Sequence, residues 1–109
     1  MLRLATCVVL VSLAGAASAA AQDAAKGEAV FAAQKCGLCH SVAGKGNPKG
    51  PLEEGVANLS AAEIRSWITD AKGMTAKTKA ARKPAMKEFT LPKEDVDALV
   101  AYLSTLKKK

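Results

Sequence analysis

Large aromatic side chains are scarce in this sequence. Its 109 residues include only two phenylalanines, one tyrosine and one tryptophan. A domain near the lower size limit with so few large apolar side chains rarely builds a sufficient core from packing alone, and it commonly adds disulfides, a metal or a cofactor. We therefore expect something other than side chains to fill part of the core.

Metal-ligating side chains are equally few. The chain has three cysteines and a single histidine, and Cys36, Cys39 and His40 fall within five consecutive positions. The lone histidine excludes any iron site that requires two imidazole ligands from this chain. The remaining cysteine, Cys7, lies in an N-terminal apolar segment.

That N-terminal apolar run, residues 4–14, is too short for a membrane span, which needs about 20 residues. Arg3 precedes it and small residues follow it up to Ala21. A charged start, an apolar run and a small-residue cleavage site are typical of a secretory leader. We expect removal of residues 1–21, including Cys7, which leaves residues 22–109 as one domain without a membrane span. A retained membrane anchor is the alternative.

Acidic residues are outnumbered. Sixteen lysines and arginines accompany ten aspartates and glutamates, which gives a formal net charge of +6. Such a surface suits an acidic protein, an anionic membrane or nucleic acid. Export argues against nucleic acid, and the chain lacks the alternation of aromatic and basic residues that stacks bases. We therefore expect no nucleic-acid partner.

Residues 24–34 have the pattern of a short helix. They are rich in alanine, contain no proline and place Gly27, Val30, Phe31 and Gln34 at helical spacing. Residues 44–51 contain so many glycines and prolines that we expect a loop.

A capping box predicts the second helix. Ser60 and Glu63 are three residues apart, so each side chain can bond the other's backbone N–H. The helix should continue to Gly73, because glycine often ends helices. Residues 72–87 are rich in lysine and lack apolar periodicity, which predicts a second long loop. The expected buried stripe of this helix comprises Ile64, Trp67 and Ile68.

The C-terminal segment has the strongest helical pattern. Pro92 suits the first turn, and Glu94 and Asp95 favour the positive end of the helix dipole. Apolar residues recur on one face at Val96, Leu99, Val100, Leu103 and Leu106, with Tyr102 beside them.

The predicted fold is therefore all-α, with three short helices joined by two long loops and no strand, repeat or second domain. Loops of that length need a reason in so small a domain. A large flat cofactor with the chain wrapped around it would supply one.

The stretch Cys36-Gly37-Leu38-Cys39-His40 has four candidate chemistries. A zinc site would need a fourth ligand from a carboxylate or a second chain. A thioredoxin-like redox pair would follow a buried strand, whereas residues 22–35 have a helical composition. A structural disulfide suits an exported protein but leaves the adjacent histidine unexplained.

Covalent heme attachment accounts for every residue of the stretch. On one helical turn, two thiols can form thioethers with the two vinyl groups at one edge of a heme, while the histidine ligates the iron. The spacing C-x-x-C-H is the c-type attachment pattern. We predict one covalent heme c on Cys36 and Cys39, with its iron bound by His40.

With these residues, the segment from Gly27 to Leu106 resembles the small bacterial monoheme cytochromes c of class I, which carry the heme motif near the N-terminus. The resemblance implies a cytochrome c-like fold wrapped around the heme. Gly27 and Phe31 resemble the pair with which the first helix of that family crosses the last. Leu99 and Tyr102 match the facing positions.

The resemblance also implies roles for residues around the heme. Gly50, Pro51 and Leu52 resemble the loop after the heme motif, and the Pro51 carbonyl would accept the second ring N–H of His40. Trp67 resembles the tryptophan that packs on the heme and donates toward a propionate. An ordinary core tryptophan is the alternative.

The second axial position of the iron decides the function. The candidates are Met74, Met86, a lysine or no protein ligand. Met74 follows Gly73 directly, which leaves little chain to cross the heme. Residues 84–89 resemble the ligand loop of the family, so the resemblance implies Met86 as the sixth ligand.

Ligation by His40 and Met86 implies a periplasmic one-electron carrier and not an enzyme, because protein ligands on both sides keep substrates from the metal. The expected partners of this monomer are redox proteins with acidic docking surfaces, such as a dehydrogenase, a cytochrome complex or an oxidase. Two alternatives stay open: the heme subunit of a dehydrogenase, and a heme enzyme or gas sensor with an open sixth position. The cations expected to steer partners are Lys72, Lys77, Lys79, Arg82, Lys83 and Lys87.

Overall fold

The structure is a computed structural model that describes residues 19–107. Most of the expected leader, including Cys7, lies outside the described residues. The elements follow in the order α1 (Ala19–Ala33), a 3-10 turn η1 (Cys36–Leu38), β1 (Ser41–Val42), β2 (Lys45–Gly46), α2 (Leu52–Gly55), α3 (Ala61–Thr69), α4 (Ala71–Thr78) and α5 (Lys93–Ser104).

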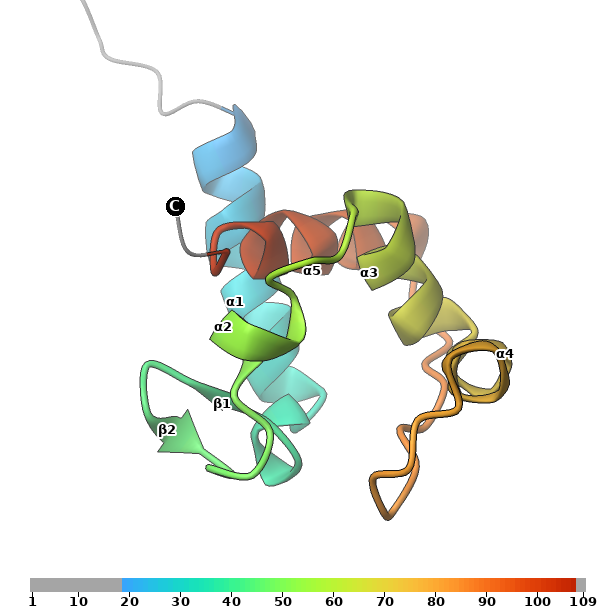
Figure 1. Cartoon of the computed structure of the whole chain (residues 1–109). Helices are drawn as coiled ribbons and strands as arrows, with labels where there is room; N and C mark the ends of the chain where they lie inside the picture. Colours follow the sequence, from blue (N-terminus) through green and yellow to red (C-terminus); the bar gives the residue numbers. More distant parts are fainter. Residues whose placement is uncertain (1–18, 108–109) are drawn as a thin grey trace, which may run out of the picture.

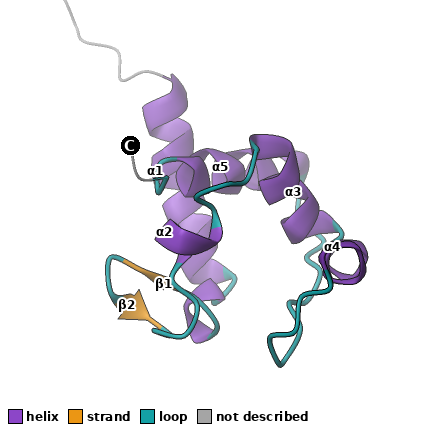
Figure 2. Ribbon diagram, in the orientation of Figure 1, coloured by secondary structure: helices purple, strands orange, loops and turns teal. Residues whose placement is uncertain are grey.

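The described chain is mostly helical, which confirms the all-α prediction (Figure 2). The prediction of three helices and no strand was incomplete. Strands β1 and β2 form a small antiparallel hairpin, with Ser41 opposite Gly46 and Val42 opposite Lys45. Two strands of two residues are too short to produce an alternating apolar pattern, so they could not be predicted from the sequence.

Helices α1 and α5 cross at close range (Figure 1). Gly27 lies at the crossing, where an added Cβ would be only 2.0 Å from the carbonyl oxygen of Ala98 and 2.6 Å from Cβ of Tyr102. The rings of Phe31 and Tyr102 meet edge to face, 5.8 Å apart. The resemblance therefore predicted Tyr102 correctly, but the backbone nearest Gly27 belongs to Ala98 and not to Leu99.

The core forms where α3 and α1 pack against α5. The predicted apolar faces of α3 and α5 are confirmed, except that Trp67, Tyr102 and Leu106 are only half-buried. Arg65 of α3 and Lys93 of α5 both pair with Asp97, which ties the two helices at the surface. The buried cluster comprises Val30, Val56, Ile64, Ile68, Val96, Leu99, Val100 and Leu103.

The capping box of Ser60 and Glu63 is present at the start of α3. The predicted end at Gly73 is wrong, because α3 ends at Thr69 and α4 begins at Ala71. The Asp70 side chain accepts a hydrogen bond from the Gly73 N–H at 3.2 Å, so it caps α4 and draws Gly73 into the first turn. The predicted loop over residues 72–87 therefore contains a helix, and the irregular segment is residues 79–92.

The chain from η1 to α2 and the chain from α4 to residue 92 lie near opposite ends of α5. In Figure 1 both lie below α5, the first near its C-terminal end and the second near its N-terminal end. None of the helices in the described part of the chain is both long enough and apolar enough to cross a membrane.

Enlarging Gly27 tests the helix crossing. Gly27→Val should lower the free energy of unfolding of the holoprotein by about 3 kcal/mol, because its side chain would overlap the Ala98 carbonyl. Urea unfolding followed by far-UV circular dichroism measures the loss. Gly55→Ala is the control, because its Cβ would meet only Leu52 at an ordinary 3.6 Å. Equal midpoints for the two variants would contradict the crossing.

Candidate functional site

The two thiols and the imidazole lie on one tight turn. Lys35 adopts a left-handed conformation with φ of 57°, which ends α1 and starts η1. The N–H groups of Cys39 and His40 both donate to the Cys36 carbonyl, at 3.2 and 2.9 Å. This local folding brings Cys36, Cys39 and His40 together, as their spacing predicted.

Both thiols are free, with Cys36 half-buried and Cys39 exposed. Burial raises the pKa of the Cys36 thiol, against smaller opposing effects of a hydrogen bond to its own backbone and of the Lys87 charge. A protonated thiol is a poor nucleophile, so the Cys36 thiol resists oxidation before heme attachment. Among the described residues, no group of three or more His, Cys, Asp or Glu side chains could hold a metal ion.

Residues 41–50 fold back on this turn and hold it by hydrogen bonds. The Asn47 N–H is bonded to the carbonyls of Gly37 and His40, both at 3.0 Å, and its side-chain amide donates to the Leu38 carbonyl at 3.1 Å. Gly46, with φ of 105°, comes so close that an added Cβ would be 2.3 Å from the His40 carbonyl oxygen. The hairpin loop therefore fixes the carbonyl side of the turn.

His40 is oriented by a hydrogen bond from its ring. Nδ1 lies 3.2 Å from the Gly50 carbonyl, so the predicted acceptor Pro51 is wrong by one residue. The Pro51 carbonyl instead accepts the Gly55 N–H of α2 at 3.0 Å. An imidazole that donates from Nδ1 keeps Nε2 available as a metal ligand.

The environment of His40 favours its neutral form. Burial lowers the pKa of His40, and the nearby Arg82 charge acts in the same direction, while the bond to Gly50 opposes them. A neutral imidazole is the form that binds metals. At neutral pH, His40 is therefore ready to act as a ligand without first losing a proton.

Two open cavities border the turn. One, of about 460 Å³, is lined by Cys39 and Leu38 on one side and by residues 82–84 on the other. The second, of about 340 Å³, is lined by His40, Pro51 and Leu52. Arg82 and Lys49 border both cavities. The predicted site residues Pro51 and Leu52 are thus brought together with His40.

The other predicted site residues lie elsewhere. Trp67 is half-buried on α3 and lines neither cavity. Met74 is buried in α4, with 8% of its surface exposed. Met86 is half-buried in the irregular segment 79–92.

Sequence reasoning missed Asn47 and Arg82 as residues that build the site, and it placed Gly50 in the loop without giving it the acceptor role. Arg82 was predicted only as a steering cation, yet its guanidinium donates to the Cys39 carbonyl. The glycine and proline content of residues 44–51 predicted a loop but carried no signal for what that loop bonds.

The chain belongs to the cytochrome c family, because the family model for cytochrome c matches residues 24–107. No curated protein and no solved structure matches it. The family carries a covalently bound c-type heme with iron and serves electron transfer, and both statements hold for this chain. The site fits that group: it offers two free thiols, an oriented imidazole and open space beside Cys39 and His40.

Removing the Asn47 side chain tests the support of the turn. Asn47→Ala loses the bond to the Leu38 carbonyl and the one that Oδ1 accepts from the Lys49 N–H. We expect the free energy of unfolding to fall by about 1–2 kcal/mol and amide exchange at residues 37–41 to accelerate. Asn58→Ala is the control, since its exposed side chain forms no hydrogen bond within the described chain. Equal exchange in both variants would contradict the role of Asn47.

Proposed function

We propose that this protein is a periplasmic one-electron carrier that holds its heme through Cys36 and Cys39 and ligates the iron with His40 and Met86. The observation that carries the proposal is the turn that carries both free thiols and, directly after them, an imidazole with Nδ1 bonded to Gly50. The leader pattern of residues 1–21 supports export to the periplasm.

The heme, when bound, supplies an iron that cycles between the ferric and ferrous states. The chain's own task is to keep the ligands unchanged in both states. The bond from His40 to Gly50 keeps the imidazole in one tautomer and one orientation and raises its basicity. Pro51 and Leu52 line the cavity beside His40. Trp67 would pack on the heme from α3.

Met86 is the better of the two methionine candidates. Met74 is buried on α4, which contacts α3, so moving its sulfur to the iron would leave a void there. Met86 lies in a segment without regular structure and is only half-buried. A soft thioether favours the ferrous state and so raises the reduction potential.

Replacing each methionine by leucine tests the ligation. Met86→Leu should abolish the far-red sulfur-to-iron absorption band of the ferric protein, whereas Met74→Leu should keep it. Leucine preserves the volume, so Met74→Leu should cost less than about 1.5 kcal/mol of stability. Loss of the band in Met74→Leu alone would overturn the assignment. Immediate binding of carbon monoxide to the reduced wild type would instead indicate an open sixth position.

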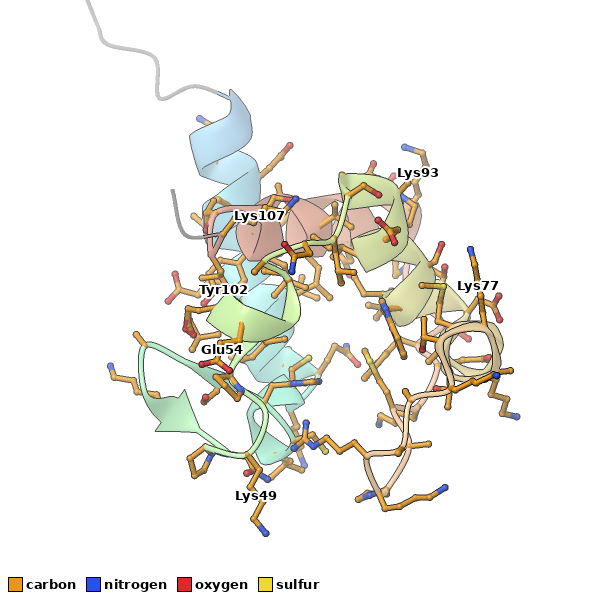
Figure 3. The ribbon with its side chains drawn as sticks, in the orientation of Figure 1. Lys49, Glu54, Lys77, Lys93, Tyr102 and Lys107 are labelled. Carbon is orange, nitrogen blue, oxygen red and sulfur yellow. The ribbon has the colours of Figure 1, made fainter. Side chains whose placement is uncertain are left out.

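The partners proposed for this carrier are redox proteins with acidic docking surfaces. Residues 71–87 contain six exposed cations and no acidic residue, and residues 35–49 contain three more cations. These two segments border the first cavity, and Lys49 and Lys77 extend from them in Figure 3. A one-signed field around a binding face steers oppositely charged partners toward it.

Charge reversal tests the steering. Lys77→Glu combined with Lys83→Glu should slow reduction by an acidic redox partner about tenfold at low ionic strength, because attraction becomes repulsion. Stopped-flow kinetics measure the rate, and the difference should shrink as salt rises. Lys26→Glu combined with Lys107→Glu makes the same change of net charge away from the cavities. Equal slowing by both double variants would contradict a localised docking face.

A further inference from the structure

Arg82 links the irregular segment 79–92 to the Cys36–His40 turn, the heme-motif turn. Its Nη2 donates to the Cys39 carbonyl, across 43 positions of sequence. Its guanidinium also lies against Gly50, where an added Cβ would be 2.3 Å from Nη1. Among the described residues, no other hydrogen bond joins residues 79–92 to residues 35–55.

The segment around Met86 has few other attachments. Residues 81–88 form no backbone-to-backbone hydrogen bond within the described part of the chain. Beyond Met86, Glu88 accepts a bond from the Lys72 N–H at 3.2 Å, and the Phe89 N–H donates to the Ile68 carbonyl at 3.1 Å. Before Met86, the Arg82 bond is the tether. An exposed segment with so few bonds opens at low cost in free energy.

Arginine suits a tether at this place. One nitrogen of its planar guanidinium bonds a carbonyl while the other lies beside Gly50, which the single ammonium group of lysine cannot reproduce. Arg82 borders the cavity beside Cys39 and also the one beside His40. Its neighbour Lys83 carries the same charge and borders the first cavity, but it forms no hydrogen bond among the described residues.

We propose that Arg82 is a positioning residue that keeps the Met86 segment closed against the Cys36–His40 turn. It thereby sets how readily an external ligand reaches the iron from the Met86 side. This second statement rests on the proposed ligation by Met86, because only then does opening of the segment expose the metal.

Imidazole binding to the ferric holoprotein tests the proposal. Arg82→Gln should raise the association constant for imidazole about three- to tenfold, the change expected from loss of one such hydrogen bond. Lys83→Gln is the matched control, since it removes the same charge from the same segment and leaves the tether intact. Binding by Arg82→Gln that equals the wild type, or an equal rise in both variants, would overturn the proposal.

Hydrogen exchange provides a readout that does not depend on the iron. The peptide covering residues 79–91 should exchange faster in Arg82→Gln than in the wild type or Lys83→Gln, while α1 and α5 stay unchanged. Unchanged exchange in that peptide would overturn the role of Arg82. If Arg82→Gln does not acquire heme, Arg82→Lys takes its place, with changes in the same direction because it loses the planar fork.

Carbon monoxide keeps the two proposals distinguishable. A reduced wild type that binds carbon monoxide at once overturns ligation by Met86, and hydrogen exchange still decides the role of Arg82. A wild type that resists carbon monoxide, together with an Arg82→Gln variant that behaves like it, overturns only the role of Arg82.

Discussion

The close crossing of α1 and α5 is the constraint on which the rest of the structure depends. Gly27 has no side chain, so the α1 backbone comes within contact of the Ala98 carbonyl, and Phe31 and Tyr102 lock the crossing edge to face. Because α1 leads directly into the heme-motif turn, its angle on α5 sets where that turn lies. Helix α3 packs on the same α5, so the position of both sides of the site depends on one helix.

The two sides of the site differ in the number of hydrogen bonds that hold them. On the His40 side, Asn47 and Gly50 hold the turn through several hydrogen bonds to its carbonyls and to the imidazole. On the Met86 side, a segment without regular structure is held by few bonds. A covalently attached group needs its attachment turn set correctly, whereas a weakly bound thioether tolerates a softer support. The distribution of hydrogen bonds matches this difference.

Much of this organisation could be predicted from the sequence. The period of apolar residues in α5 and the capping box at Ser60 are local signals, and both elements formed as expected. The end of α3 could not be predicted as easily, because Asp70 and Gly73 each suit either a stop or a new start. The acceptor for His40 was misplaced by one residue, since the sequence of residues 50–51 does not reveal which carbonyl α2 uses. Contacts between distant segments, such as Arg82 with Cys39, produce no periodic pattern in the sequence and could not be predicted from it.

The part of the irregular segment that precedes Met86, residues 79–85, is exposed, and this has an evolutionary meaning. This stretch contributes nothing to the buried cluster of α1, α3 and α5. Apart from Arg82, residues there can be exchanged without the stability penalty that follows changes inside the core. Proteins with this fold could therefore evolve different reduction potentials through substitutions in one short exposed segment, while the helical core stays the same.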